Sequence, residues 1–154
     1  MKKVYHGKNP PFEFSQITKY VYIGTDACCT INFQRKLLQK HIKADISLES
    51  ERLDKPYGVD YYLWLPVKNH YAPTQMQLKL GVEFIDSLIK KKHPVFVHCR
   101  NGHGRAPTLV AAYLISKGMK IEEAIKFVKS KRPVVHLNER QLASLRKFKK
   151  SLKY

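Results

Sequence analysis

Acidic residues are scarce in this chain. Its 154 residues include 12 Asp and Glu against 29 Lys and Arg, which gives a formal net charge of +17. The imbalance is strongest after Ser87, where the only acids are Glu122, Glu123 and Glu139. A surplus of this size attracts polyanions such as nucleic acid, anionic lipid or polyphosphate. We therefore expect a highly anionic substrate, while the charge itself indicates no particular fold.

Cysteines and long apolar runs are also few. The three cysteines are an odd number, and Cys28 and Cys29 are adjacent. This pattern is not a disulfide framework, so we interpret the pair as packing residues and expect a reducing, cytoplasmic environment. The longest apolar run, residues 109–115, is too short to span a bilayer, and the basic segment before PPFEF lacks the apolar core of a secretory signal. We expect a soluble intracellular protein without a transmembrane segment.

The chain contains no internal repeat or linker, so its length predicts one domain over residues 1–154. Short apolar, aromatic or β-branched runs predict strands at residues 20–23, 45–48, 59–67 and 94–99. Helical spacing of apolar residues, with capping-box patterns at Thr74 and Asn138 and a stop at Gly118, predicts helices at residues 32–42, 74–91, 105–117, 121–131 and 138–152. This alternation predicts an α/β fold with a central, mainly parallel sheet flanked by helices.

The segment FVHCRNGHGRAPT, residues 96–108, joins a predicted buried strand to a predicted helix. Ligands of α/β proteins bind beyond the carboxyl ends of strands, which is where Cys99 stands. Gly102 and Gly104 allow the backbone to turn its amides inward, and the helix begins with unpaired amides and a positive dipole end. Arg105 adds a planar fork of donors for two phosphate oxygens. Together these groups predict an oxyanion site with Cys99 at its base.

Cys99 is a candidate nucleophile, because cations and a helix N-terminus stabilise a thiolate. A sulfur presented to a held phosphate supports phosphoryl transfer through a phosphocysteine that water then hydrolyses. The alternative is a buried cysteine that only ends a core strand. A Walker-type loop does not fit, since no Lys follows the second glycine, and Cys28, Cys29, His98 and Cys99 lack the ligand spacing of a zinc site. The sequence implies neither a metal ion nor an organic cofactor.

The loop resembles that of a known superfamily. His98, Cys99, five further residues and Arg105 match the signature loop of the cysteine-dependent protein tyrosine phosphatases, and the single-domain layout looks like their dual-specificity branch. The segments VFVHC, LVAAYLI and IEEAIKFVKSKRP also resemble dual-specificity phosphatases and the mitochondrial phosphatidylglycerophosphate phosphatases. The resemblance implies that fold over residues 20–152, with Cys99 as nucleophile and His98 as the residue that orients and tunes it. It implies a phosphate-binding role for Arg105 and for Arg100, Asn101, Gly102, His103, Gly104 and Ala106.

The resemblance also implies an aspartate upstream of the cysteine that protonates the leaving oxygen. The corresponding segment, LPVKNHYAPT at residues 65–74, contains no carboxylate, and Lys68 or Asn69 stands at the expected position. His70 is a tentative general acid in this loop, with Asp60 as a second candidate, and the alternative for His70 is an exposed histidine without a catalytic role. General acids contribute about 10²- to 10⁴-fold, most for poor alkyl leaving groups. The missing aspartate therefore favours aryl esters, or phosphoanhydrides, over alkyl esters.

Two other positions in the loop affect the expected activity. Ala106 stands where most relatives have a hydroxyl group that helps the sulfur leave, which implies slower turnover. Glucan phosphatases also have alanine here, so the resemblance does not imply a loss of activity. Arg100 and His103 resemble the cations that phosphoinositide phosphatases direct at neighbouring phosphates, although Arg100 could instead point to solvent. The basic C-terminal helix could bind RNA or lipid, or form a solvated face.

We expect a cysteine-dependent phosphatase of the protein-tyrosine or dual-specificity type that hydrolyses phosphomonoesters without the usual aspartate. An RNA 5′-triphosphatase is the first alternative, favoured by the charge and the missing acid. A phosphoinositide or phosphatidylglycerophosphate phosphatase is the second, favoured by Arg100 and His103. The non-enzymatic alternative is a phosphate-binding module, which the retained Cys99 and Arg105 oppose. The expected partner is thus a phosphoprotein, an RNA 5′ end or a phospholipid headgroup.

Overall fold

The computed structural model describes residues 6–152, which contain one five-stranded sheet. Its order is β1-β2-β5-β3-β4, and every neighbouring pair is parallel except the antiparallel pair β1 and β2. The strands are β1 Phe14–Gln16, β2 Val21–Gly24, β3 Ala44–Glu49, β4 Tyr61–Val67 and β5 Val95–His98. The predicted mainly parallel α/β sheet is confirmed, and β5 is its central strand, with all four residues buried.

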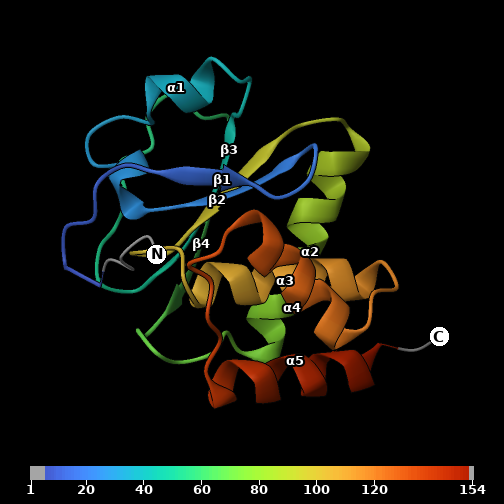
Figure 1. Cartoon of the computed structure of the whole chain (residues 1–154). Helices are drawn as coiled ribbons and strands as arrows, with labels where there is room; N and C mark the ends of the chain where they lie inside the picture. Colours follow the sequence, from blue (N-terminus) through green and yellow to red (C-terminus); the bar gives the residue numbers. More distant parts are fainter. Residues whose placement is uncertain (1–5, 153–154) are drawn as a thin grey trace.

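Helices cover the two faces of the sheet unequally. One side carries α2 to α5 and the other carries the short α1 (Figure 1). The bounds are η1 Asp26–Cys28, α1 Arg35–Leu38, α2 Gln75–Lys90, α3 Arg105–Ser116, α4 Ile121–Lys131 and α5 Glu139–Ser151. The larger apolar cluster lies among α2 to α5 and the sheet, and a smaller one, including Tyr22, Phe33 and Phe96, lies on the α1 side. No helix within residues 6–152 is long and apolar enough to cross a membrane.

The helix bounds agree with the capping signals in the sequence. Thr74 and Asn138 both form complete capping boxes, in which each side chain accepts from the amide three residues on and a glutamine side chain returns the bond. Gly118 follows α3 with φ of 106°, the left-handed conformation that ends a helix. The bounds of four of the five predicted helices are therefore correct to within one or two residues.

The predicted helix at residues 32–42 is mostly absent. Only one turn, α1, forms, and Phe33 lies before it, with its amide donating to the carbonyl of Tyr57 at 3.0 Å. The backbone of Gln34 is extended, and His41 has a φ of 61°, which turns the chain toward β3. The apolar periodicity there marks residues of the smaller cluster, including Leu37 and Ile42, rather than a continuous helix.

The adjacent cysteines form a disulfide, which corrects their interpretation as mere packing residues. Cys28 and Cys29 are both buried in the smaller cluster, and their sulfur atoms are bonded to each other. Cys28 is the last residue of the short turn η1, and Cys29 is its C-cap residue. Spacing in the sequence did not indicate this bond. Cys99 is the one free cysteine of the chain.

Candidate active site

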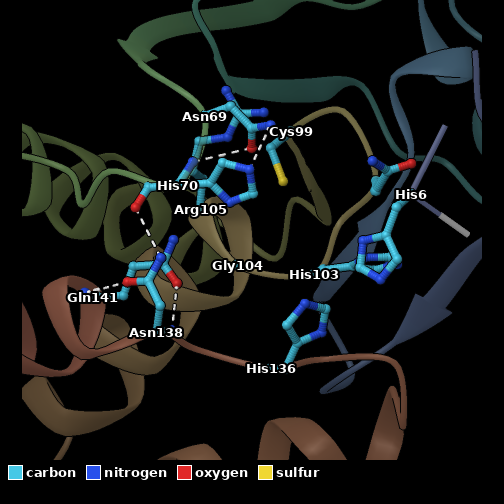
Figure 2. Close-up of a pocket in the computed structure, with 11 residues that line it drawn as sticks. His6, Asn69, His70, Cys99, His103, Gly104, Arg105, His136, Asn138 and Gln141 are labelled. Carbon is cyan, nitrogen blue, oxygen red and sulfur yellow. Dashed lines mark hydrogen bonds between the residues drawn. The ribbon is translucent and has the colours of Figure 1, made fainter. Parts of the chain in front are cut away.

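Cys99 lies at the end of the central strand and at the base of a pocket. Residues 99–104 join β5 to α3, and the Cys99 side chain is buried with its sulfur directed into the pocket (Figure 2). The pocket has a volume of about 200 Å³. Polar side chains and backbone dominate its lining, which consists of His6, Asn69, His70, Cys99, Asn101, His103, Gly104, Arg105, His136, Asn138 and Gln141. No carboxylate is among these described lining residues.

The two loop glycines are required for different reasons. Gly102 has φ of 68°, the left-handed region, and a Cβ there would lie 2.7 Å from Arg132 and from the carbonyl oxygen of Gly24. Gly104 does not need positive φ, because its φ is −131°. A Cβ at Gly104 would instead lie 2.9 Å from the side chain of Gln141. Gly104 thus allows α5 to approach the loop closely.

The loop presents free donors to the pocket. Within residues 6–152, the amides of residues 101–104 have no hydrogen-bond acceptor. The first turn of α3 is also uncapped, since its N-cap residue is Gly104. Such amides, together with the positive end of a helix dipole, bind an anion. The geometry is therefore that of the predicted oxyanion site around Cys99.

Arg105 is held beside the pocket by an acid and a carbonyl group. Its Nη1 donates to both carboxylate oxygens of Glu51, at 3.0 and 2.9 Å, and to the carbonyl oxygen of Val67 at 2.7 Å. Burial would raise the pKa of Glu51, but the Arg105 guanidinium lowers it below its usual value. All three contacts use Nη1, which leaves the Nε and Nη2 groups without a partner among the described residues. These two donors can bind a phosphate.

Arg132 fixes the loop from behind. Its Nε donates to the carbonyl oxygen of Gly102 at 2.8 Å, and its Nη2 donates to that of Asn101 at 3.0 Å. The same guanidinium pairs with Glu13 and donates to Ser15. With 1% of its surface exposed, Arg132 connects the loop to the edge of the sheet. The bonds hold two loop carbonyls away from the pocket, so that the adjacent amides face it.

His98 is a buried cation next to Cys99. Its Nε2 lies 2.7 Å from Asp54 and 3.4 Å from Asp45, and its Nδ1 donates to the carbonyl oxygen of Cys99 at 3.2 Å. Burial alone would lower the pKa of His98, but the charges of Asp45 and Asp54 raise it well above its usual value. Burial also raises the pKa of Asp45, and the charge of His98 opposes that shift. The arrangement fixes the backbone of Cys99 and places a positive charge close to it.

The loop that carries His70 is attached to α5. The Asn138 side chain donates to the carbonyl oxygen of His70 at 2.8 Å, and the Gln141 side chain donates to that of Tyr71 at 3.2 Å. His70 has φ of 69°, and its amide donates to Asn69 at 3.1 Å. Figure 2 shows the His70 ring near Arg105, on the side of the pocket opposite His6. His70 therefore lines the pocket on the loop that lacks the expected aspartate.

Not every residue predicted for phosphate binding reaches the pocket. Asn101, His103, Gly104 and Arg105 line it. The guanidinium of Arg100 instead faces two acids, at 3.9 Å from Glu49 and 4.0 Å from Glu51, and is absent from the lining. Ala106 is fully buried in the core below the loop, so it offers only its backbone. Lys68 and Asp60 do not line the pocket either.

Sequence reasoning missed the residues that support the loop. Glu51, Asp54 and Arg132 come from segments 30 to 50 residues away, and only the KSKRP segment of the resemblance pointed to one of them. Asn138 and Gln141 were identified as helix-capping residues, but nothing in their spacing showed the second bonds to residues 70 and 71. His136 and His6 also line the pocket. A local sequence motif therefore identifies the reacting residues but not the distant residues that hold them in place.

Comparisons with known proteins agree with this geometry. Residues 21–151 match the family described as dual specificity phosphatase, catalytic domain. Dual specificity protein phosphatase 1 of Arabidopsis thaliana is 41% identical over 154 residues, which cover 97% of this chain and 74% of that protein. Dual specificity protein phosphatase 5 of Rattus norvegicus is 35% identical over 80 residues, 51% of this chain. The match covers about a fifth of that longer relative, 21% of its length.

Solved structures show the same fold. The crystal structure of PTPMT1 is 27% identical, covers 90% of this chain and 94% of its own, and superposes with a TM-score of 0.77. A complex of PTPMT1 with PI(5)P is 25% identical with a TM-score of 0.74, covering 89% of this chain and 94% of its own. The matched segment contains the cysteine loop and all the helices of the larger layer. The chain belongs to the dual specificity phosphatase family, as its loop motif indicated.

Proposed function

We propose that this protein is a cysteine-dependent phosphatase that prefers aryl phosphomonoesters such as phosphotyrosine. The observation that carries the proposal is the position of the Cys99 sulfur at the base of a pocket with free loop amides and Arg105. The relatives of this chain are named as phosphatases, which supports the same reaction class. The preference for aryl esters rests on the pocket lining, because none of the described residues that form it carries a carboxylate.

The reaction proceeds in two displacements. The Cys99 thiolate attacks phosphorus, so an S–P bond forms as the P–O bond to the leaving group breaks. Arg105 and the amides of residues 101–104 bind the three non-bridging oxygens of the phosphoryl group and stabilise their charge. The leaving oxygen takes a proton on departure. Water then attacks phosphorus, the S–P bond breaks, and inorganic phosphate and the Cys99 thiolate are released.

His70 is the proton donor that we assign to the first step. It lines the same pocket as Cys99, on the loop where the family has its aspartate. Asn69 and Asn138 hold its backbone in place. A protonated imidazole can protonate a leaving oxygen, whereas Asn69 has no acidic proton to give. A phenolate needs this proton less than an alkoxide does, which agrees with the proposed aryl preference.

His98 acts as a positioning residue rather than by contact with substrate. It is fully buried, and Cys99 O, Asp45 and Asp54 are its partners. Its bond to the carbonyl oxygen of Cys99 fixes the backbone from which the sulfur projects into the pocket. The resemblance to the family implied this role, and the geometry supports it.

A phosphoinositide phosphatase is the second candidate function. It is favoured by the similarity to PTPMT1, which has been crystallised with PI(5)P, and by the net charge of +17. The position of Arg100 argues against it, because this cation faces Glu49 and Glu51 rather than a second phosphate. The alkyl leaving group of an inositol phosphate also depends more on a general acid than an aryl leaving group does.

The test is phosphate release by the wild type and Cys99→Ser from a panel of substrates. The panel contains an aryl phosphate, phosphotyrosine and phosphoserine peptides, triphosphate-ended RNA and vesicles with PI(5)P. We expect aryl substrates to be hydrolysed fastest, and Cys99→Ser to lower kcat/KM by more than about 10³-fold. Faster release from RNA or from vesicles would replace the aryl assignment by that alternative. No Cys99-dependent release from any substrate would instead identify a phosphate-binding module.

Arg105→Lys separates catalysis from folding. Lysine keeps the positive charge but lacks the planar fork, so kcat/KM for the aryl phosphate should fall by about 10²- to 10³-fold. The matched control is Arg146→Lys, at an exposed residue of α5 that pairs only with Glu139. Equal activity of the wild type and Arg105→Lys would contradict the assigned role of the guanidinium.

A further inference from the structure

Three histidines meet at the edge of the pocket. His6 precedes β1, His103 is in the cysteine loop, and His136 lies between α4 and α5. Their ring centroids are 5.2 Å apart for His6 and His103, 5.4 Å for His6 and His136, and 5.2 Å for His103 and His136. Figure 2 shows the three rings grouped on one side of the pocket. The proposed phosphatase reaction gives none of them a role.

Each of the three rings offers one nitrogen atom to the cluster. These three nitrogen atoms all lie within 4.8 Å of one another. Tetrahedral zinc with Zn–N bonds near 2.0–2.1 Å separates its ligand nitrogens by about 3.4 Å. The rings must therefore approach by at most about 1.4 Å to bind an ion together. His6 and His136 are exposed, so rotation of their side chains can supply this movement.

Hydrogen bonds already hold part of the cluster in a ligating form. The Nδ1 of His136 lies 2.9 Å from the carbonyl oxygen of Val134, so it carries the proton and leaves Nε2 as the free lone pair. The amide of His136 donates to the carbonyl oxygen of His103 at 3.0 Å, which ties the two ligands together.

The surroundings tolerate a bound cation. The guanidinium of Arg132, which bonds to the loop that carries His103, is already paired with Glu13. Imidazole is a preferred ligand of zinc, copper, iron and nickel, and three histidines with one open position form a known zinc geometry. The second group of ligating side chains, Cys28, Cys29, Asp45 and His98, is fully buried and contains the disulfide. It is therefore much less suited to take up an ion.

We propose that His6, His103 and His136 form a binding site for one divalent transition-metal ion at the edge of the phosphate pocket. The three histidines line the same pocket as Cys99, so an oxygen of an anion bound there could complete the coordination of the ion. The ion adds two positive charges beside the oxyanion site. The proposal concerns a metal site and stands whether or not the pocket catalyses phosphate release.

The test is Zn²⁺ titration of the Cys99→Ser protein in competition with a chromogenic zinc indicator. The Cys99→Ser background removes the thiolate, which would otherwise be a competing ligand. We expect one Zn²⁺ per chain, and a rise in unfolding temperature on adding the ion. His6→Ala and His136→Ala, made separately in this background, should each weaken binding by at least about tenfold. Co²⁺ should give the visible spectrum of a tetrahedral nitrogen site, and each variant should lose it.

His93→Ala is the matched control, at an exposed histidine outside the pocket lining. It should bind Zn²⁺ as the Cys99→Ser parent does. The His6 side chain is exposed, so His6→Ala should unfold at the same temperature as the parent in the absence of metal. A loss of Zn²⁺ binding in this variant is then not caused by misfolding. Absence of Zn²⁺ binding by the parent would overturn the proposal. Equal affinity of the His6, His136 and His93 variants would overturn it as well.

Discussion

The carboxylate of Glu51 clamps Arg105 from the side away from the pocket. Both of its oxygens accept from the single Nη1 atom, at 3.0 and 2.9 Å, and the carbonyl oxygen of Val67 takes a third bond from the same atom at 2.7 Å. The guanidinium plane is therefore fixed before any anion binds, with its other donors still available. Glu51 thus orients the cation of the site and also offsets part of its charge.

Replacement of Glu51 by Gln tests this orienting role. Glutamine can accept from Nη1 through one oxygen only, and it loses the charge that holds the guanidinium. We expect kcat/KM for an aryl phosphate to fall about tenfold, a loss of about 1.4 kcal/mol, mainly through a higher KM. Steady-state kinetics measure this, with Glu83→Gln on the exposed face of α2 as control. A lower KM would show that Glu51 competes with substrate instead of orienting Arg105.

Arg132→Leu should destabilise the fold as well as the loop. The change leaves the carbonyl oxygens of Asn101 and Gly102 and the Glu13 carboxylate without their donor. Arg132 is 1% exposed but Glu13 is 47% exposed, so most of the cost comes from the two loop carbonyl oxygens that lose their donor, and we expect the free energy of unfolding in urea to fall by about 2 kcal/mol. Arg146→Leu removes an ion pair whose two side chains are 55% and 76% exposed, so it should change stability by less than about 1 kcal/mol. Similar losses for both variants would contradict this account.

Glu49→Gln should change how stability depends on pH. Burial, followed by the charge of Asp26 and a hydrogen bond with it, raises the pKa of Glu49 from 4.5 to about 8. The unfolded chain loses this proton near pH 4.5 and the folded chain keeps it to about pH 8, so folding takes up a proton between these values. The stability of the wild type therefore falls as pH rises through that window. Glutamine has no such proton, and the stability of the variant should rise relative to that of the wild type by about 3 kcal/mol between pH 5 and pH 8.

The measurement for Glu49→Gln is the free energy of unfolding in urea at several pH values from 5 to 8. The control is Glu123→Gln, at an exposed acid of α4. Its stability curve should run parallel to that of the wild type. A parallel curve for Glu49→Gln would mean that Glu49 is ionised in the folded protein at neutral pH.

Local signals predicted most of the fold. Capping boxes at Thr74 and Asn138 and the glycine after α3 act within a few residues, so the sequence shows them directly. The helix expected at residues 32–42 is limited to one turn by the non-helical backbone of Gln34 and the positive φ of His41, which no local pattern indicates. The strand β1 was also missed, since it has three residues and pairs only at the edge of the sheet.

The candidate site divides in the same way. Cys99, the loop glycines and Arg105 lie within one short segment. Their roles could be predicted because a loop between a strand and a helix N-terminus is a typical anion site. Arg100 could not be placed from its position alone, since its direction depends on the distant acids Glu49 and Glu51. The disulfide of Cys28 with Cys29 depends on the side-chain directions at the end of η1, which adjacency does not determine.

His70→Ala tests the assigned proton donor through the leaving group. A set of aryl phosphates whose phenols differ in pKa gives a slope of log kcat/KM against leaving-group pKa. Loss of a general acid leaves more negative charge on the departing oxygen, so the slope should become steeper, with the largest loss, about 10²-fold, for the poorest leaving group. His93→Ala is the matched control, at an exposed histidine outside the pocket lining, and its slope should equal that of the wild type.

Asn138→Ala separates the chemistry of His70 from its placement. The Asn138 side chain donates to the carbonyl oxygen of His70 at 2.8 Å and holds the loop against α5, but it does not touch the ring. Loss of the Asn138 side chain should lower kcat/KM moderately for all leaving groups, because the His70 ring is then correctly placed only part of the time. The double variant Asn138→Ala, His70→Ala should be little less active than His70→Ala alone. If His70→Ala leaves the slope unchanged, the proton comes from solvent. In that case the preference for aryl esters should be stronger still, since an alkoxide could leave only without assistance from the protein.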